Sequence, residues 1–528
     1  MTTIGEALVH QLKALGVDTV FGIPGVHTVE LYRGLTGSGI RHVTPRHEQG
    51  AGFMADGYAR VSGRPGVAFV ITGPGLTNML TPMAQARADS SPMLVLSGVN
   101  ALATLGKGLG HLHELPDQRA LSALVSLSAA RIEGPGDLIP ALETAFDGFA
   151  AARPGPRHIE IPTDVMDLAG PNGLVSAGRA APPRPDAAGL SRAADLLAQA
   201  RSPVILAGGG AKFAGAELIA IAERLNAPVA QTTNARGVMF AHPLGIPASP
   251  GMDAVRDLIR RADVVLAVGT EFGPTEYDMY GTGEFPWPET LVRIDICPDQ
   301  LARRPATVAL TGDAAATLAQ LRDALPEQSH PARDGAETAA RTRAAAWAEL
   351  SPEMRLQSEI LAAMRDAVPG AIMVGDSTQA TYGGDLYHDH DRPAGWFNSA
   401  TGYGALGFAI PASIGAALAA PEARVLCLTG DGGAQFTLPE LMTAVDERLP
   451  ITFMIWNNAG YQEIATSMQA RGVPVLGCDP TPPDFAGIAR ACAIPHRHAA
   501  MTPQAVAEAL RDLVPSGGPV MIEIDARL

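Results

Sequence analysis

The chain has 528 residues with 47% hydrophobic content, which is enough to bury several cores and suggests three or four domains. Its formal net charge of −15 argues against a nucleic-acid partner. No apolar run reaches the length of a transmembrane helix, and the first residues lack the basic and apolar regions of a signal peptide. The composition therefore predicts a cytoplasmic protein that does not act at a membrane.

Residues 1–170 alternate strand-like and helix-like runs, as the apolar runs at 66–71 and 93–97 illustrate. Within this part, Glu48 lies between a strand-like run at 40–44 and a helix with an apolar face. This position predicts a partly desolvated carboxyl group. Burial raises the pKa of a carboxyl group, so such a group can take part in proton transfer.

A proline-rich stretch at 178–186 and a polar stretch at 326–334 divide the chain into thirds. The middle third, residues 187–325, again alternates strands and helices. Its glycines 208–210 follow a strand and precede a helix, as a dinucleotide-binding loop would. The full G-x-G-x-x-G pattern is missing and no acidic partner stands out. We therefore expect a Rossmann-like domain without a bound nucleotide.

The last third contains two buried-strand runs, at 424–429 and 451–456. The sequence at 437–440 between them fits a helix start with a capping box. Because parallel strands end at the same edge of a sheet, Asp431 and Asn458 are expected to meet there. Their oxygen atoms suit Mg²⁺, and the glycines around Asp431 let backbone N–H groups approach a phosphate.

The alternation of strands and helices thus predicts an α/β protein with three doubly wound parallel-sheet domains, at residues 1–170, 187–325 and 350–528.

Five motifs together resemble those of thiamin diphosphate (ThDP) enzymes. Gly430-Asp431-Gly432, followed after 24 residues by Asn457-Asn458, resembles their diphosphate-binding motif. The segments at 20–25, 46–50, 55–60 and 72–78 are similar to the pyrimidine-binding domain of the 2-oxo acid decarboxylase and acetolactate synthase group. The resemblance covers nearly the whole chain. It implies a pyrimidine-binding domain at 1–170, a middle domain at 187–325 and a diphosphate-binding domain at 350–528.

The resemblance implies ThDP and Mg²⁺ as cofactors, with FAD not expected in the middle domain. Glu48 matches the family's acid at the pyrimidine nitrogen, and Leu406 matches the apolar wedge that bends the cofactor. The implied metal ligands are Asp431, Asn458 and the backbone carbonyl of Gly460. The other implied cofactor contacts are Gly25, Thr72, Asn78, Ser377, Thr378, Gly404, Gly430, Gly432, Gly433 and Tyr461.

The product depends on what happens after CO₂ is lost, because the reacting carbon is then either protonated, giving an aldehyde, or added to a second carbonyl compound, giving a hydroxyketone. Acetolactate synthases carry a Phe-Gln pair where this chain has Leu112-His113, with His111 close by. Histidine can donate a proton near neutral pH, which favours the aldehyde. Glu463 is expected to lie near the cofactor, as a buried acid with a partner, where acetolactate synthases have a different stretch.

Stretches at 21–35, 107–119 and 460–464 are similar to 5-guanidino-2-oxopentanoate (2-ketoarginine) decarboxylases. Four acids are available for a guanidinium group, namely Glu30, Glu114, Asp117 and Glu463. We therefore predict a non-oxidative decarboxylase of a small 2-oxo acid. The alternatives are a carboligase of the acetolactate synthase type and a ThDP-binding protein that has lost catalysis. The resemblance also implies a dimer or homotetramer with active sites at the subunit interface.

Overall fold

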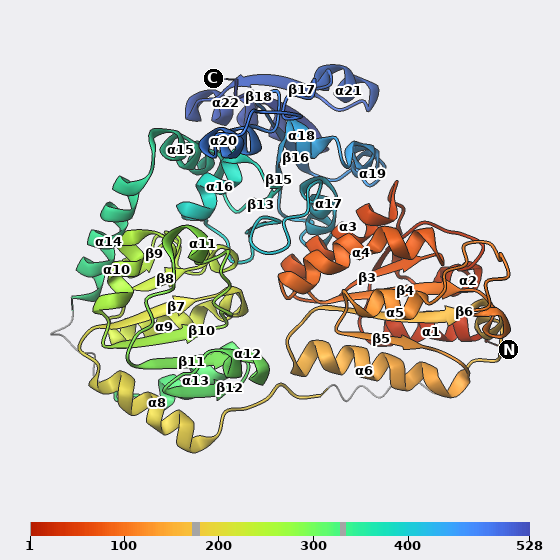
Figure 1. Cartoon of the computed structure of the whole chain (residues 1–528), viewed down its shortest axis with the longest axis horizontal. Helices are drawn as coiled ribbons and strands as arrows, with labels where there is room; N and C mark the ends of the chain where they lie inside the picture. The colour runs from red at the N-terminus through yellow and green to blue at the C-terminus, as the bar shows by residue number, and fades with distance from the viewer. Residues whose placement is uncertain (1, 172–179, 328–333, 528) are drawn as a thin grey trace.

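The computed structural model describes residues 2–171, 180–327 and 334–527. It contains three six-stranded parallel sheets with helices around them, which confirms the predicted class of three doubly wound α/β domains. Figure 1 shows the first domain in red to orange at the right, the middle domain in yellow to green at the left, and the third in cyan to blue above both. The predicted linkers at 178–186 and 326–334 lie partly outside the described residues. In the described ranges no helix combines the length and the apolar character needed to span a bilayer.

The first sheet has the strand order β2-β1-β3-β4-β6-β5. Its central strands β3 and β4 are buried along their whole length, as expected for a parallel sheet covered on both faces. The elements are α1 (Ile4–Ala14), β1 (Thr19–Gly22), α2 (Val29–Leu35), β2 (Arg41–Val43), α3 (Glu48–Ser62), β3 (Gly66–Val70), α4 (Pro74–Ala88), β4 (Met93–Val99), η1 (Leu102–Thr104), α5 (Gln118–Ala123), β5 (Ser128–Arg131), η2 (Pro135–Asp137), α6 (Leu138–Ala151), β6 (Pro156–Pro162) and α7 (Thr163–Met166).

The middle sheet has the order β12-β11-β10-β7-β8-β9. Gly208 donates its N–H to Val268, and Gly210 donates to Gly269, so this loop packs closely on the loop after β10. The elements are α8 (Ala187–Gln199), β7 (Pro203–Ala207), η3 (Gly209–Ala211), α9 (Gly215–Leu225), β8 (Val229–Gln231), η4 (Thr233–Ala235), β9 (Gly245–Ile246), α10 (Asp253–Arg261), β10 (Val264–Val268), α11 (Met279–Thr282), β11 (Leu291–Asp295), α12 (Pro298–Arg303), β12 (Val308–Thr311) and α13 (Ala314–Ala324).

The third sheet has the order β14-β13-β15-β16-β18-β17, and α14 leads to it from the middle domain (Figure 1). Its elements are α14 (Gly335–Glu349), α15 (Pro352–Ala367), β13 (Ile372–Gly375), α16 (Gln379–Leu386), β14 (Trp396–Asn398), α17 (Ala409–Ala419), β15 (Val425–Gly430), α18 (Asp431–Ala434), η5 (Leu438–Glu440), α19 (Leu441–Asp446), β16 (Ile451–Asn457), α20 (Gln462–Ala470), α21 (Phe485–Ala491), β17 (His496–Ala500), α22 (Pro503–Leu513), η6 (Val514–Ser516) and β18 (Val520–Asp525).

Helices α3 and α17 join the first and third domains at very short range. A Cβ atom at Gly57 would lie 2.1 Å from the carbonyl oxygen of Ala412, and one at Gly415 would lie 1.9 Å from that of Met54. No side chain fits at either glycine, so the two backbones approach closely. Residues of both domains form one continuous apolar core around this crossing. The crossing therefore fixes α3, whose first residue is Glu48, against the third domain.

The predicted capping box at 437–440 is wrong. Thr437 donates its hydroxyl to the Gly407 carbonyl at 2.9 Å and makes no cap, and Leu438–Glu440 is a 3₁₀ turn. The buried Glu440 carboxylate instead accepts the backbone N–H groups of Arg46 and His47 at 3.0 to 3.1 Å. Glu440 of the third domain thus holds the segment just before α3, a contact that the local pattern did not contain.

Candidate active site

The structure brings the predicted metal ligands Asp431 and Asn458 together. Strand β15 ends at Gly430, and its neighbour β16 ends at Asn457, so the next residue of each strand lies at the same edge of the sheet. The backbone N–H of Asn458 donates to Asp431 Oδ1 at 3.3 Å.

Two oxygen atoms of this pair have no donor. Asp431 Oδ2 and Asn458 Oδ1 are buried and accept no hydrogen bond from the described residues. The Asn458 amide nitrogen donates to Gln379 Oε1 at 3.2 Å, which fixes the orientation of its oxygen. Because buried oxygens are normally paired, two unpaired ones on residues that contact each other fit a cation that takes oxygen ligands. Burial raises the pKa of Asp431, against the lowering effect of backbone N–H groups that include that of Asn458.

The segment after Asn458 is held tightly in place. Ala459 has a left-handed backbone conformation with φ 58°, which is strained for a residue with a side chain. Tyr461 donates its backbone N–H to the Cys478 carbonyl at 2.8 Å. The Tyr461 ring lies against Gly432, where a Cβ atom would be 2.4 Å from the ring. Glycine at 432 therefore allows the two predicted cofactor segments, 430–433 and 458–461, to pack together.

Asp376 connects the remaining predicted cofactor segments, although sequence reasoning favoured its neighbours Ser377 and Thr378. Its carboxylate accepts the backbone N–H of Ser377 at 3.0 Å and that of Gly407 at 2.9 Å, and it also accepts the Thr429 hydroxyl at 3.4 Å. Complete burial raises the pKa of Asp376 to about 6, even though backbone N–H groups lower it. The buried Thr378 lies beside Gly430. Asp376 thus connects its own loop and the loop of Gly407 with the end of β15.

Leu406, the predicted wedge, is half-buried between two anchored residues. The N–H of Ala405 donates to Gln85 Oε1 of the first domain at 3.0 Å, and the N–H of Gly407 donates to Asp376. Gly404 has φ 78°, a conformation that glycine adopts without strain. The backbone on both sides of Leu406 is therefore fixed, as a steric role requires.

In the first domain, Glu48 begins α3 and is half-buried, as expected. Its Oε2 accepts a hydrogen bond from the Asn78 amide at 2.9 Å. Asn78 was predicted as a cofactor contact, and in this structure it orients the Glu48 carboxylate.

Thr72 and Gly25 lie in loops at the same end of the first domain. The Thr72 hydroxyl and the Gly73 N–H both donate to Gln118 Oε1 at 2.9 Å, so the buried Thr72 side chain holds its own loop. The Gly25 N–H and carbonyl both bond the Thr28 hydroxyl, at 3.3 and 3.1 Å. Gln118 was missed by the sequence reading because it follows the histidine segment by several residues.

The two predicted histidines differ in position. His111 is exposed, whereas His113 is half-buried with φ 61°, and its backbone packs on Gly73. The His113 ring meets the ring of His27 edge to face, with centroids 5.5 Å apart. His27 is buried, and its Nδ1 has no hydrogen-bond partner among the described residues. Burial and then the nearby His113 lower the pKa of His27, which keeps His27 neutral at neutral pH. In the sequence, His27 stands two residues after Gly25, within the stretch at 21–35 that carries the resemblance, but no pattern marked it as a functional residue.

Of the four acids considered for a guanidinium group, three are engaged elsewhere. The Glu114 carboxylate accepts the backbone N–H groups of residues 108–111, Asp117 caps α5, and Glu30 pairs with Arg33. Glu463 is exposed near the start of α20 in the single chain, and its burial with a partner stays a prediction. It makes no hydrogen bond or ion pair within the described ranges. Burial and then the charge of Glu463 raise the pKa of Tyr382 on α16.

The predicted residues thus form two groups in one chain. One group lies in the first domain around Glu48 and His113, and the other lies in the third domain around Asp431 and Asn458. Across the part of the chain that the structure describes, no hydrogen bond, ion pair or ring contact joins a predicted residue of one group to one of the other.

Comparisons with known proteins match all three domains. Family models match residues 2–121 as "Thiamine pyrophosphate enzyme, N-terminal TPP binding domain", residues 190–321 as its central domain, and residues 376–524 as its C-terminal TPP binding domain. The chain is 44% identical to the probable 2-ketoarginine decarboxylase AruI of Pseudomonas aeruginosa, over 97% of this chain and 91% of the relative. It is 33% identical to the acetolactate synthase large subunit of Corynebacterium glutamicum, over 86% of this chain and 75% of that relative. It is also 33% identical to the acetolactate synthase isozyme 3 large subunit of Escherichia coli, over 87% of this chain and 82% of that relative.

Proposed function

We propose that this chain, which belongs to the thiamine pyrophosphate enzyme family, removes CO₂ from 5-guanidino-2-oxopentanoate and releases the aldehyde. Family membership confirms the predicted resemblance. The chain is a ThDP-dependent enzyme of the decarboxylase type, because it is 44% identical to a probable 2-ketoarginine decarboxylase, while the acetolactate synthases match it at 33% identity or less. The similarity to the probable 2-ketoarginine decarboxylase also supports 5-guanidino-2-oxopentanoate as the proposed substrate.

In this proposal the third domain holds Mg²⁺ and the diphosphate. Asp431 Oδ2 and Asn458 Oδ1, the two buried oxygens without donors, ligate Mg²⁺ together with the carbonyl of Gly460. Gly430, Gly432 and Gly433 present backbone N–H groups to the phosphates, and Ser377, Thr378, Gly404 and Tyr461 complete this side. Leu406 supports the bent cofactor by packing alone. When bound, ThDP would supply a nucleophilic carbon for the 2-oxo group and a cationic ring able to take up the electron pair that CO₂ leaves behind.

The first domain supplies the proton-transfer groups. Because Asn78 occupies Glu48 Oε2, the other carboxyl oxygen remains to share a proton with the pyrimidine nitrogen. The loops of Gly25 and Thr72 shape this side of the site. His113 donates the proton that turns the reacting carbon into an aldehyde, and the neutral His27 beside it orients the His113 ring. His111 lies outside the pair of rings formed by His27 and His113, so His113 is the proton donor in this proposal.

We place the complete active site between two chains, with the first-domain group of one facing the third-domain group of the other, in a dimer or tetramer. Large exposed apolar side chains support this arrangement. They flank the histidines at Val26, Leu109 and Leu112, and they flank the metal segment at Ile464 and Leu476. Apolar side chains in contact with water at both groups are typical of a surface that a partner covers.

Glu463 is the acid that we assign to the guanidinium group. Its replacement by Gln is expected to lower kcat/KM for 5-guanidino-2-oxopentanoate about 10- to 100-fold, which is the effect of losing one charged hydrogen bond. Turnover of 2-oxopentanoate, which lacks the guanidinium group, should change little. The rates are measured from CO₂ release, with the product identified by chromatography, and Glu359→Gln on the exposed face of α15 is the matched control.

Three results would change the assignment. Equal losses with both substrates would remove Glu463 from substrate recognition. A hydroxyketone in place of the aldehyde would make the chain a carboligase. No CO₂ from any 2-oxo acid would overturn the proposed function as a whole.

His113→Gln is expected to lower kcat about 100-fold, because an amide cannot donate the proton that the aldehyde requires. His111→Gln serves as the control and should retain kcat, since its side chain is exposed and outside the pair with His27. Steady-state turnover and the product ratio are the measurements. A loss in His111→Gln without one in His113→Gln would exchange the two roles.

A further inference from the structure

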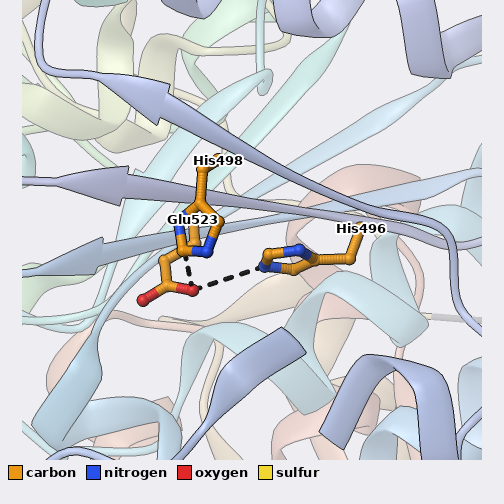
Figure 2. A group of neighbouring side chains, drawn as sticks. All are labelled: His496, His498 and Glu523. Atoms are coloured by element: carbon orange, nitrogen blue, oxygen red, sulfur yellow. Dashed lines mark ion pairs between the residues drawn. The ribbon is translucent and has the colours of Figure 1, made fainter. Parts of the chain in front are cut away.

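Three side chains capable of binding a metal meet on one face of the third sheet, at its edge. Strand β17 is the edge strand and runs parallel to β18, with His498 in register with Glu523. His496 lies two residues before His498, so both side chains project from the same face of the strand. Figure 2 shows dashed lines from one oxygen of the Glu523 carboxylate to both histidine rings.

The spacing of their atoms fits a single ion. Glu523 Oε2 lies 3.3 Å from His496 Nε2 and 3.6 Å from His498 Nδ1, and all three possible ligand atoms lie within 4.8 Å of one another. Two ligands of a tetrahedral zinc ion, with bonds of about 2.0–2.1 Å, are separated by about 3.3 Å. The two distances from Glu523 Oε2 are therefore close to those in a tetrahedral coordination sphere.

A second observation also points to a ligand. His496 Nε2 is buried, and within the described residues it has no hydrogen-bond partner, because its contact with Glu523 has the distance of an ion pair but not the geometry of a hydrogen bond. The other carboxylate oxygen, Oε1, accepts the Asn457 amide at 2.7 Å, which holds the carboxylate so that Oε2 faces the histidines. Residues that hydrogen-bond to a metal ligand commonly fix its orientation, and Asn457 does this for Glu523.

The surroundings leave one side open and add negative charge. The side chains of His496 and Glu523 are 13% and 11% exposed, whereas that of His498 is 66% exposed, so an ion can enter from solvent and keep a water ligand. Asp484 adds negative charge near His496, whereas Asp525, which lies near His498, is paired with Arg527.

We propose that His496, His498 and Glu523 form a second metal site, which binds a divalent transition metal such as Zn²⁺ or Co²⁺. Two imidazole nitrogens and one carboxylate oxygen favour these ions over Mg²⁺, which takes oxygen ligands. The ion ties the edge strand β17 to β18. Through Glu523 it also fixes Asn457, the residue before Asn458. The site is therefore structural and is separate from the Mg²⁺ ligands.

Cobalt titration tests the site directly. The purified chain is stripped of metals with a chelator, loaded with ThDP and excess Mg²⁺, and titrated with Co²⁺ while visible absorption is recorded. We expect one Co²⁺ per chain, with the absorption band of a four- or five-coordinate ion. His498→Ala, at an exposed position, and Glu523→Gln, which keeps an oxygen for Asn457, should each weaken Co²⁺ binding at least about tenfold.

Two controls identify the binding residues. His10→Ala removes an exposed histidine elsewhere and should bind Co²⁺ like the unchanged chain. Asp431→Asn alters the proposed Mg²⁺ site and should also retain the Co²⁺ band. The proposal is overturned if no band appears, if the band is lost in Asp431→Asn but kept in His498→Ala, or if His10→Ala weakens binding as much as His498→Ala does. Circular dichroism spectra confirm that each variant is folded.

Discussion

Glu48→Gln is expected to lower kcat by about 10²–10⁴-fold, the usual contribution of a group that moves a proton in catalysis. The glutamine side chain has nearly the same shape and still offers an oxygen to Asn78, whose amide lies 2.9 Å from the carboxylate. It cannot share a proton with a ring nitrogen. Decarboxylation at saturating ThDP and Mg²⁺ is the measurement.

Glu133→Gln provides the matched control, because the Glu133 side chain is 58% exposed and lies in the same domain. Both variants should unfold at the temperature of the unchanged chain, since neither substitution removes buried apolar contacts. Full turnover by Glu48→Gln would refute the role assigned to Glu48.

Asp431→Asn is expected to weaken the apparent affinity for Mg²⁺ by about 100-fold or more. Mg²⁺ is held by few protein groups, and the charged ligand contributes most of the attraction. The substitution leaves an oxygen that is neutral, so a large excess of Mg²⁺ should restore part of the activity. The measurement is activity as a function of Mg²⁺ concentration at fixed ThDP.

Asp366→Asn is the control for charge alone, because the Asp366 side chain is 67% exposed on α15. Its Mg²⁺ dependence should match that of the unchanged chain. If Asp431→Asn has the same Mg²⁺ dependence as this control, Asp431 is not a metal ligand.

Mixing these two inactive variants tests where the active site lies. If each site takes Glu48 from one chain and Asp431 from another, a mixed dimer of Glu48→Gln and Asp431→Asn chains contains one intact site. Random reassembly then restores about a quarter of normal activity, because half of the dimers are mixed and half of their sites are intact. No recovery in mixed dimers separated by different affinity tags would place both groups of a site in one chain.

The fold was largely predictable because its signals are local. Runs of apolar residues such as 66–71 and 451–456 became the strands β3 and β16, since a strand buried on both faces must be apolar throughout. The meeting of Asp431 and Asn458 followed from one rule about where parallel strands end.

The remaining features depend on contacts between residues far apart in the sequence. The sequence around Glu440 fits a local helix cap, yet its carboxylate instead accepts the backbone N–H of Arg46, which lies 394 residues earlier. Glu114 is an acid near the predicted histidines, but its carboxylate accepts hydrogen bonds from four backbone N–H groups of its own loop. The contact between His27 and His113 requires two separate loops to converge, so neither segment alone reveals it.

The crossing of α3 and α17 has a consequence for synthesis of the chain. Helix α3 ends at Ser62 and α17 begins at Ala409, so roughly 350 residues are made between them. At about 5–20 residues per second, the apolar face of α3 that α17 covers stays exposed for roughly 20–70 seconds on the ribosome. We therefore expect a fragment that stops before α17 to aggregate. Full-length yield in cells should depend on chaperones that bind the nascent first domain.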